Sequence, residues 1–254
     1  MRGYVITGAA RGLGLALAQA VIAQGGHLIA LARNESAELR ALAEQGRGYR
    51  FVACDLSDMH ALPDLADEVF GSLASIAWES LTLINNAGVI DPIGPSGTLD
   101  DAAIVRLVQI NVTAPMLLTN AFIRHLGPHR FDRRIMNISS GAGRRPSEGW
   151  STYCASKAAL DMFTLTAAQE QASHDGIGMV SIAPGIIDTG MQSQIRQSTT
   201  DQFPNLEYFI NMKETGQLTS PEVCAEKLIA YLHDARFGQD AIADIRAPFP
   251  GGSA

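Results

Sequence analysis

The chain has 254 residues, 46% of them hydrophobic, which is enough to bury the core of one large α/β domain. Its formal net charge is −7, no long basic run is present and no apolar run approaches the length of a membrane span, so we expect neither nucleic-acid nor membrane binding. Three widely spaced cysteines argue against a disulfide framework and against a zinc site, so we expect a cytoplasmic protein without a bound metal.

A short β-favouring run near the start of the chain is followed by a glycine-rich turn and then by an apolar helical pattern. The run covers residues 4–6, and the turn over residues 7–14 reads T-G-A-A-R-G-L-G. Strand, turn and helix in this order predict a phosphate-binding loop, the alternative being a structural turn without a ligand. Gly8 would permit the tight turn, Gly12 the approach of a pyrophosphate, and Gly14 close packing of the helix.

The second strand is expected over residues 27–32, and Arg33 and Asn34 follow it. In a dinucleotide-binding fold this strand end faces the adenosine ribose, where an acidic residue selects NAD. Residues 32–34 include no acid, whereas Arg33 and Arg11 could together clamp a 2′-phosphate. We therefore predict NADP; the alternative is that Arg33 is a solvated residue that opens the next helix.

Strand-like and helical patterns alternate along the rest of the chain. Further strands are expected over 49–53, 81–84, 134–138, 179–183 and 241–245, with helices over 35–45, 59–76, 99–122, 150–171 and from Ser220 onward. About seven strands without a linker predict one doubly wound (Rossmann) parallel α/β domain over 1–247, followed by a flexible tail over 248–254. The alternation of strand and helix patterns stops at residues 188–218, and we expect these residues to form a substrate loop with little regular structure.

The segment G-W-S-T-Y-C-A-S-K-A-A-L, residues 149–160, carries the strongest chemical signal. Tyr153 and Lys157 are four residues apart and so share one face of the predicted helix. A nearby lysine cation lowers the pKa of a tyrosine toward the working pH, which suits proton transfer to a carbonyl oxygen. Ser139 and Ser140, at the end of the preceding strand, can bring a hydroxyl to the same pocket.

Six motifs together resemble a known family. They are T-G-A-A-R-G-L-G, N-N-A-G at 85–88, the helical Asn111, I-S-S at 138–140, Y-C-A-S-K and P-G-I-I-D-T. Their order and spacing resemble those of the short-chain dehydrogenases/reductases over essentially the whole chain, and G-W-S-T-Y-C-A-S-K-A-A with P-G-I-I-D-T-G-M-Q resembles the sepiapterin reductase and benzil reductase branch. The resemblance implies an NADPH-dependent carbonyl reductase that transfers a hydride to an aromatic, dicarbonyl or pterin-like ketone.

The resemblance also implies the role of each site residue. Tyr153 would donate the proton, Lys157 would lower its pKa and bind the nicotinamide ribose, and Ser140 would hydrogen-bond the substrate carbonyl. Asn111 would hold a water that links Lys157 to solvent. The residues expected to bind NADP(H) are Gly8, Arg11, Gly12, Leu13, Gly14, Arg33, Asn34, Asp55, Leu56, Asn86, Ala87, Gly88, Tyr153, Lys157, Pro184, Gly185, Ile187 and Thr189.

The substrate side is expected to involve Ser140, Trp150, Met191 and Asp244. Trp150 could equally be a core residue, and Asp244 a surface acid at a strand end. Many family members end in Asp-Gly-Gly where this chain has A-D-I-R at 243–246, which puts a tetramer built through the C-terminus in doubt. By analogy with the family we expect a homodimer, with a tetramer as the alternative.

Two other functions fit parts of the sequence. The chain could act on a different alcohol or ketone, such as an acyl thioester, a sugar or a steroid, because substrate choice is expected to lie in residues 188–218. It could also be a non-catalytic NADP-binding sensor. A sensor would be expected to lack the tyrosine or the lysine, and here Asn111, Ser140, Tyr153 and Lys157 are all present.

Overall fold

A single parallel sheet of seven strands forms the centre of the protein, in the order β3-β2-β1-β4-β5-β6-β7. The computed structural model describes residues 1–45, 48–127, 129, 131–172 and 176–247, so the expected tail lies outside the described residues. The strands are β1 (Arg2–Thr7), β2 (His27–Ala32), β3 (Tyr49–Ala53), β4 (Ser80–Asn85), β5 (Asp132–Ile138), β6 (Gly178–Ala183) and β7 (Ile242–Asp244). This strand order confirms the predicted doubly wound fold.

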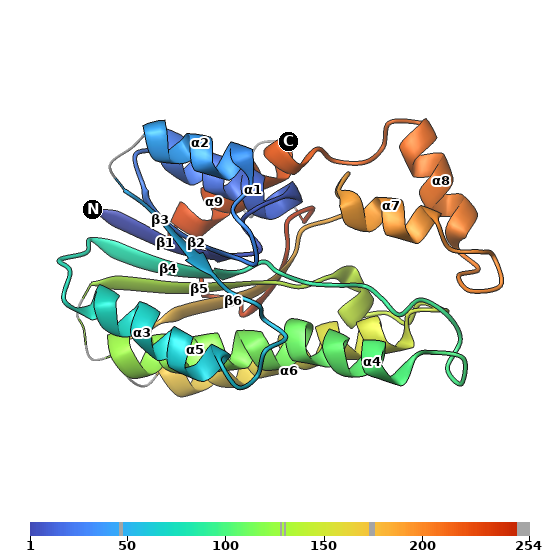
Figure 1. Cartoon of the computed structure of the whole chain (residues 1–254), viewed down its shortest axis with the longest axis horizontal. Coiled ribbons are helices and arrows are strands. Elements are labelled where there is room, and N and C mark those ends of the chain that lie inside the picture. The colour runs from blue at the N-terminus through green and yellow to red at the C-terminus, as the bar shows by residue number, and fades with distance from the viewer. Residues whose placement is uncertain (46–47, 128, 130, 173–175, 248–254) are drawn as a thin grey trace.

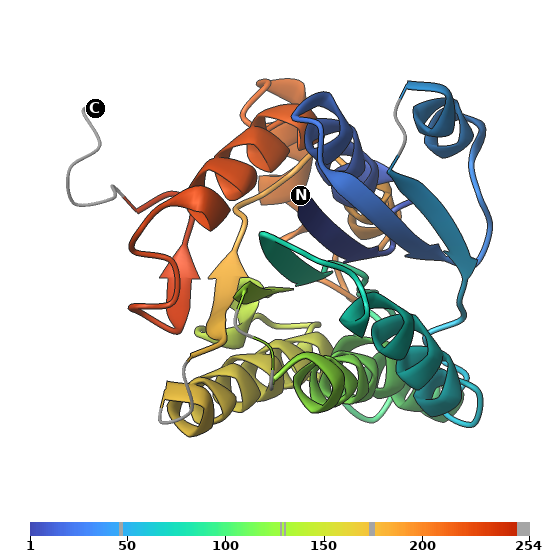
Figure 2. The same ribbon diagram turned by 90° about the vertical axis from the view of Figure 1, so that its left-hand side faces the viewer.

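Helices cover both faces of the sheet (Figures 1 and 2). One face carries α1 (Gly12–Ala23), α2 (Ala37–Gln45) and α9 (Pro221–His233); the other carries α3 (Leu62–Ala74), α4 (Asp101–Val108), α5 (Ala114–Leu126) and α6 (Ser151–Ala172). Successive strand residues point to opposite faces of the sheet. Val5 therefore packs with residues of α3 and α5, and Ile6 packs with residues of α1 and α9. Burial on both sides explains why these strands read as continuous apolar runs.

The long helix expected over 99–122 is interrupted. It divides into α4, a π-helical turn over Gln109–Thr113, and α5. By length and composition alone, the whole stretch Asp101–Leu126 could cross a membrane, so the expectation that no such stretch exists is wrong. In this fold the stretch belongs to the helical layer that contains α3 and α6, and 39% of its most apolar window is buried.

Residues 188–218 contain more regular structure than we expected. Two helices, α7 (Gly190–Arg196) and α8 (Leu206–Glu214), lie beyond the carboxyl edge of the sheet (Figure 1), and we refer to residues 188–218 as the lid. The expectation of little regular structure is wrong because these short helices are stabilised by tertiary contacts that leave little periodicity in the sequence. Phe203, in the turn that joins them, is fully buried against Trp150 and Phe209.

Candidate active site

The carboxyl ends of the central strands meet at one edge of the sheet. Thr7 ends β1, and its hydroxyl accepts hydrogen bonds of 3.0 Å from the backbone N–H groups of Asn86 and Ala87, which follow β4. The Asn86 side-chain amide donates to the Thr7 carbonyl at 2.9 Å. Asn86 therefore fixes two strand ends, and its predicted ribose contact would use other atoms of the residue. Sequence reasoning missed Thr7, although a hydroxyl before the glycine turn was a visible signal.

The glycine-rich turn has the geometry that a phosphate-binding loop requires. Gly8 and Gly12 have φ angles of 66° and 54°, which side-chain-bearing residues rarely adopt. A Cβ on Gly14 would lie 2.1 Å from the Gly8 carbonyl oxygen, so close packing requires glycine there. Helix α1 has no acidic residue in its first turn and no side-chain cap at Arg11, so its N-terminal N–H groups suit an anion. A Cβ on Gly12 would lie 3.3 Å from the Thr189 methyl group, so Thr189 faces this turn.

The predicted 2′-phosphate site lies on the surface beside this turn. Arg11, Arg33 and Asn34 are exposed, and in the described part of the chain neither arginine forms an ion pair with a carboxylate. The Asp55 carboxylate accepts hydrogen bonds from the N–H and the hydroxyl of Ser57, and these bonds, together with the Arg33 charge, lower its pKa. Asp55 thus stabilises the turn that follows β3, and it lies within electrostatic range of Arg33.

Asn111 lies inside the π-helical turn and is 1% exposed. Its side chain accepts from the Val89 N–H at 2.9 Å and donates to the Val89 carbonyl at 2.8 Å and to the Ser156 hydroxyl at 3.1 Å. Pro115, four residues later, has no N–H, so the Asn111 carbonyl lacks its ordinary α-helical donor. This arrangement suits the predicted water link, which would use the backbone carbonyl because the side chain is already engaged.

Lys157 is 4% exposed and donates a 2.8 Å hydrogen bond to the carbonyl of Ile138, the last residue of β5. Burial lowers the pKa of the Lys157 ammonium to about 8, against an opposing effect of the Asp161 carboxylate. A Cβ on Gly88 would lie 3.5 Å from the Lys157 Nζ, so the lysine also reaches the turn that follows β4. The lysine therefore reaches the strand ends where a cofactor would bind.

Tyr153 is 6% exposed, and its phenol lies beside the Ser140 hydroxyl. Burial raises the pKa of Tyr153 to about 12, although the Ser140 hydroxyl acts in the opposite direction. The Lys157 Nζ lies 5.8 Å from the centre of the Tyr153 ring. Burial therefore dominates this shift, and the predicted lowering of the Tyr153 pKa by Lys157 stays a prediction. The three predicted groups nevertheless come together.

An aromatic wall lies beside Tyr153. Trp150 is 7% exposed, stacks on Phe203 with ring centres 4.4 Å apart, and meets Tyr153 edge-on at 5.8 Å. Met191, from α7 of the lid, packs against the same cluster. Trp150 is thus both a core residue and a neighbour of the predicted proton donor. The lid holds the wall in place.

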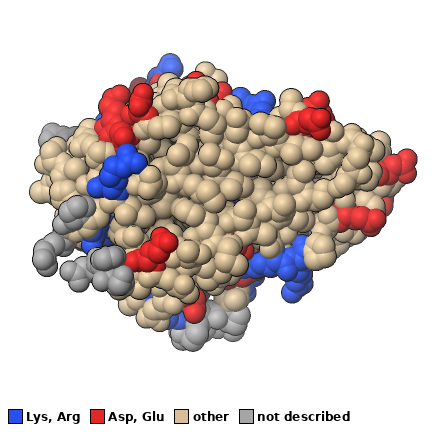
Figure 3. Space-filling model, turned by 90° about the horizontal axis from the view of Figure 1, so that it is seen from below, with Lys and Arg blue, Asp and Glu red and all other residues tan. Residues whose placement is uncertain are grey.

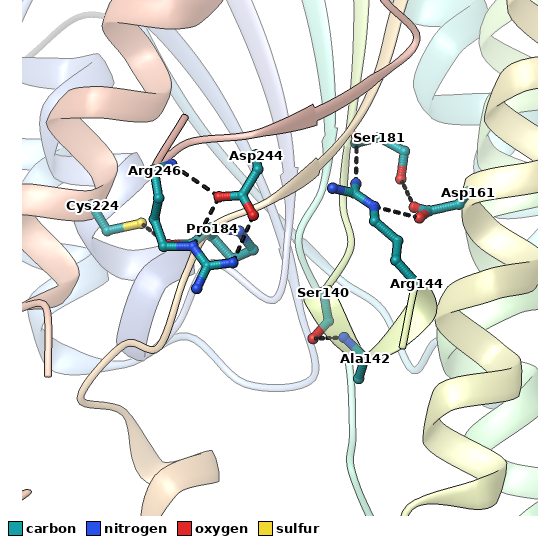
Figure 4. A network of polar contacts seen from close by, with 9 residues as sticks. All are labelled: Ser140, Ala142, Arg144, Asp161, Ser181, Pro184, Cys224, Asp244 and Arg246. Carbon is teal, nitrogen blue, oxygen red and sulfur yellow. Dashed lines mark hydrogen bonds and ion pairs between the residues drawn. The ribbon is translucent and has the colours of Figure 1, made fainter. Parts of the chain in front are cut away.

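Asp244 is the last residue of β7, and its carboxylate forms an ion pair with Arg246. The carboxylate accepts from the backbone N–H and the Nε of Arg246, both at 2.9 Å, and from its Nη2 at 2.6 Å (Figure 4). The Arg246 side chain crosses the strand end beside Gly185, and its Nη2 approaches Gly141, which follows Ser140. The predicted substrate contact of Asp244 stays a prediction.

The remaining predicted cofactor residues also lie along this edge. Leu13 is in the first turn of α1, and Leu56, Ala87 and Gly88 follow β3 and β4. Pro184, Gly185 and Ile187 follow β6, where Ile187 pairs with Thr219 at the base of the lid.

The chain is similar to known proteins over nearly its whole length. Residues 3–200 match the family described as short chain dehydrogenase. A benzil reductase ((S)-benzoin forming) of Bacillus cereus is 38% identical over 247 residues, which cover 96% of this chain and 99% of the relative. A sepiapterin reductase of Xenopus tropicalis is 32% identical over 242 residues, 90% of each chain. The crystal structure of the KRED1-Pglu enzyme has a TM-score of 0.82 at 29% identity, covering 96% of this chain and 100% of that chain.

Proposed function

The chain belongs to the short-chain dehydrogenase family, in the branch of the benzil and sepiapterin reductases, and we propose that it is an NADPH-dependent reductase of ketones and diketones. One observation carries the proposal: Ser140, Tyr153 and Lys157 converge at the carboxyl edge of the sheet, beside an aromatic wall. The family establishes an oxidoreductase that acts on CH–OH or C=O groups with a nicotinamide cofactor. The choice of NADPH and of substrate is our proposal.

The glycine turn fits a dinucleotide. The pyrophosphate would lie on the N-terminus of α1, where Gly12 leaves the space that a Cβ would fill. Arg11 and Arg33 would bind the 2′-phosphate, and their exposed guanidinium groups support the choice of NADPH over NADH. When bound, NADPH supplies the hydride.

The site residues would then act on the carbonyl oxygen. Ser140 would donate a hydrogen bond to this oxygen and fix its position, while the Tyr153 hydroxyl would give it a proton. The protonated Lys157 would stabilise the negative charge left on the phenol, and Asn111 would connect Lys157 to solvent. Because burial raises the pKa of Tyr153 to about 12, the phenol is protonated near neutral pH, as a proton donor must be.

The wall of Trp150 and Met191 favours a flat apolar substrate, which is consistent with the benzil reductase relatives. A pterin would have to compete for Asp244 with the Arg246 guanidinium, which already occupies the carboxylate. We therefore favour an aromatic diketone over a pterin. The lid, residues 188–218, would close over this substrate.

We further propose a homodimer formed through α4 and α6. Val105 and Val108 of α4 and Met162 of α6 are 57%, 42% and 62% exposed, and these two helices pack side by side. Figure 3 shows this face of the molecule with few charged side chains across its middle. Exposed apolar residues on such a face are typical of an interface. The three free cysteines are consistent with a cytoplasmic location.

A substrate panel tests the proposal. NADPH oxidation is measured with benzil, isatin, sepiapterin, an acetoacetyl thioester and a ketosteroid, with NADH in parallel. We expect turnover of the diketones with NADPH and little with NADH. Preference for NADH would contradict the assignment of Arg33, and tight NADPH binding without turnover of any carbonyl would point to a sensor.

A further inference from the structure

A buried carboxylate lies one helical turn beyond Lys157 and has no part in the chemistry described so far. Asp161 is on α6, four residues after Lys157, and 10% of its side chain is exposed. Its Oδ1 accepts from the Ser181 hydroxyl at 2.6 Å, and its Oδ2 accepts from the Arg144 Nε at 3.0 Å (Figure 4). Withdrawing a carboxylate from water is costly unless its charge is satisfied, so this position needs a physical reason.

Arg144 connects this carboxylate to the turn that carries Ser140. The turn is a 3₁₀ helix over Gly141–Gly143, and Arg144 follows it directly. A Cβ on Gly143 would lie 2.7 Å from the Lys157 carbonyl carbon, so the turn lies flush against the backbone of α6. The ion pair therefore ties the turn that begins at Ser140 to the helix of Tyr153 and Lys157.

Charges of alternating sign lead from Lys157 to the surface. Asp161 follows Lys157, Arg144 pairs with Asp161, and the Arg144 charge also acts on Asp244 of β7, which Arg246 holds. Of the charged groups in the described ranges, Asp161 is the one whose field shifts the pKa of Lys157. It raises that pKa against the larger effect of burial.

We propose that Arg144 and Asp161 are positioning residues: they hold the Ser140 turn against α6, and the Asp161 carboxylate helps to keep Lys157 in its ammonium form. This inference rests on the proposed roles of Ser140, Tyr153 and Lys157 in carbonyl reduction. Tyr153 is the other titratable group that faces Lys157, and it is neutral over the pH range of interest. Arg144 compensates the Asp161 charge, so we expect removal of Arg144 to strengthen the effect of Asp161 on Lys157.

The test measures the protonation of Lys157 directly, without cofactor or substrate. The sequence contains three lysines, Lys157, Lys213 and Lys227, so lysine-labelled protein gives three NMR titration curves. Asp161→Asn removes the charge that favours the ammonium, so the pKa of Lys157 falls below about 8, by about one pH unit. Arg144→Met leaves the Asp161 charge uncompensated, so the pKa of Lys157 rises.

The control is Arg145→Met, which removes the neighbouring exposed guanidinium and should leave the Lys157 curve unchanged. Shifts of opposite sign in Asp161→Asn and Arg144→Met support the proposal. The proposal is overturned if the Lys157 titration curve moves in neither variant, or if it moves in the same direction in both. If Asp161→Asn does not fold, the sign of the Arg144→Met shift decides alone.

Activity provides a second readout. The alkaline limb of the kcat profile should move to lower pH in Asp161→Asn and to higher pH in Arg144→Met. A merely structural role would lower kcat without moving the limb. Failure of the proposed function is recognised separately, because the wild-type protein would then reduce no carbonyl while the NMR titration could still be read.

Discussion

Burial acts in opposite senses on the two titratable residues of the candidate site. It raises the pKa of the Tyr153 phenol to about 12 and lowers the pKa of the Lys157 ammonium to about 8. In both cases desolvation disfavours the charged form. The spacing of Tyr153, Lys157 and Ser140 in the sequence was enough to predict that they meet. The direction of the Tyr153 shift could not be predicted, because it depends on how deeply the lid and Trp150 bury the phenol.

Replacement of the single residue Arg33 tests the proposed preference for NADPH over NADH. Arg33→Ala removes a charge-assisted contact to the 2′-phosphate, so kcat/KM for NADPH should fall about 10- to 100-fold. The value for NADH, which lacks this phosphate, should stay within about twofold. Arg40→Ala is the control, since Arg40 is also an exposed arginine but lies on α2 and pairs with Glu35. An equal loss for both cofactors would contradict the prediction.

In our proposal the lid is the element that shapes the substrate side of the site. Its turn sits on Gly149 and Trp150: Gly149 has a φ of 80°, and a Cβ there would lie 2.2 Å from the Gln202 carbonyl oxygen. The close approach lets Phe203 stack on Trp150. Two features therefore require glycine at position 149: the positive φ angle and the close contact with the lid backbone.

Gly149→Ala should displace the lid. We expect KM for an aromatic diketone to rise at least about tenfold, because the wall of Trp150 loses its support. Gly25→Ala is the matched control: Gly25 has a φ of 72° and nothing within 4 Å of its Cβ position. It should cost about 1 to 2 kcal/mol of unfolding free energy for the backbone angle, without an effect on KM. Equal KM values in the two variants would show that the lid does not shape the substrate site.

Strands and most helices were predictable because local signals agree with the fold. The helix expected from Ser220 onward is α9: Ser220 caps it, accepting from the Val223 N–H at 3.3 Å, and Pro221 is at the first helical position. The lid helices and the π-helical turn at Asn111 were not predictable. The former depend on burial of Phe203, and the latter on a side chain that bonds to the distant Val89 backbone. Sequence periodicity does not record such contacts.

At the scale of the whole molecule, α4 and α6 form an exposed apolar face, and we propose that a second copy of the chain covers it. Val105→Glu with Met162→Glu places two carboxylates on this face, so we expect a dimer to become a monomer in analytical ultracentrifugation with an unchanged circular dichroism spectrum. Val223→Glu is the control, because Val223 is 45% exposed but lies on α9, on the other side of the sheet. A wild-type protein that sediments as a monomer would contradict the proposed dimer.

The central claim is that Tyr153 donates the proton in an NADPH-dependent carbonyl reduction, and Tyr153→Phe tests it most directly. This change removes one oxygen atom and keeps the ring that packs against Trp150. We predict that the rate of NADPH oxidation with benzil falls at least about 100-fold, while the Kd for NADPH stays within about twofold. A variant that binds NADPH and reduces benzil at nearly the wild-type rate would contradict the assignment of Tyr153 and the mechanism built on it.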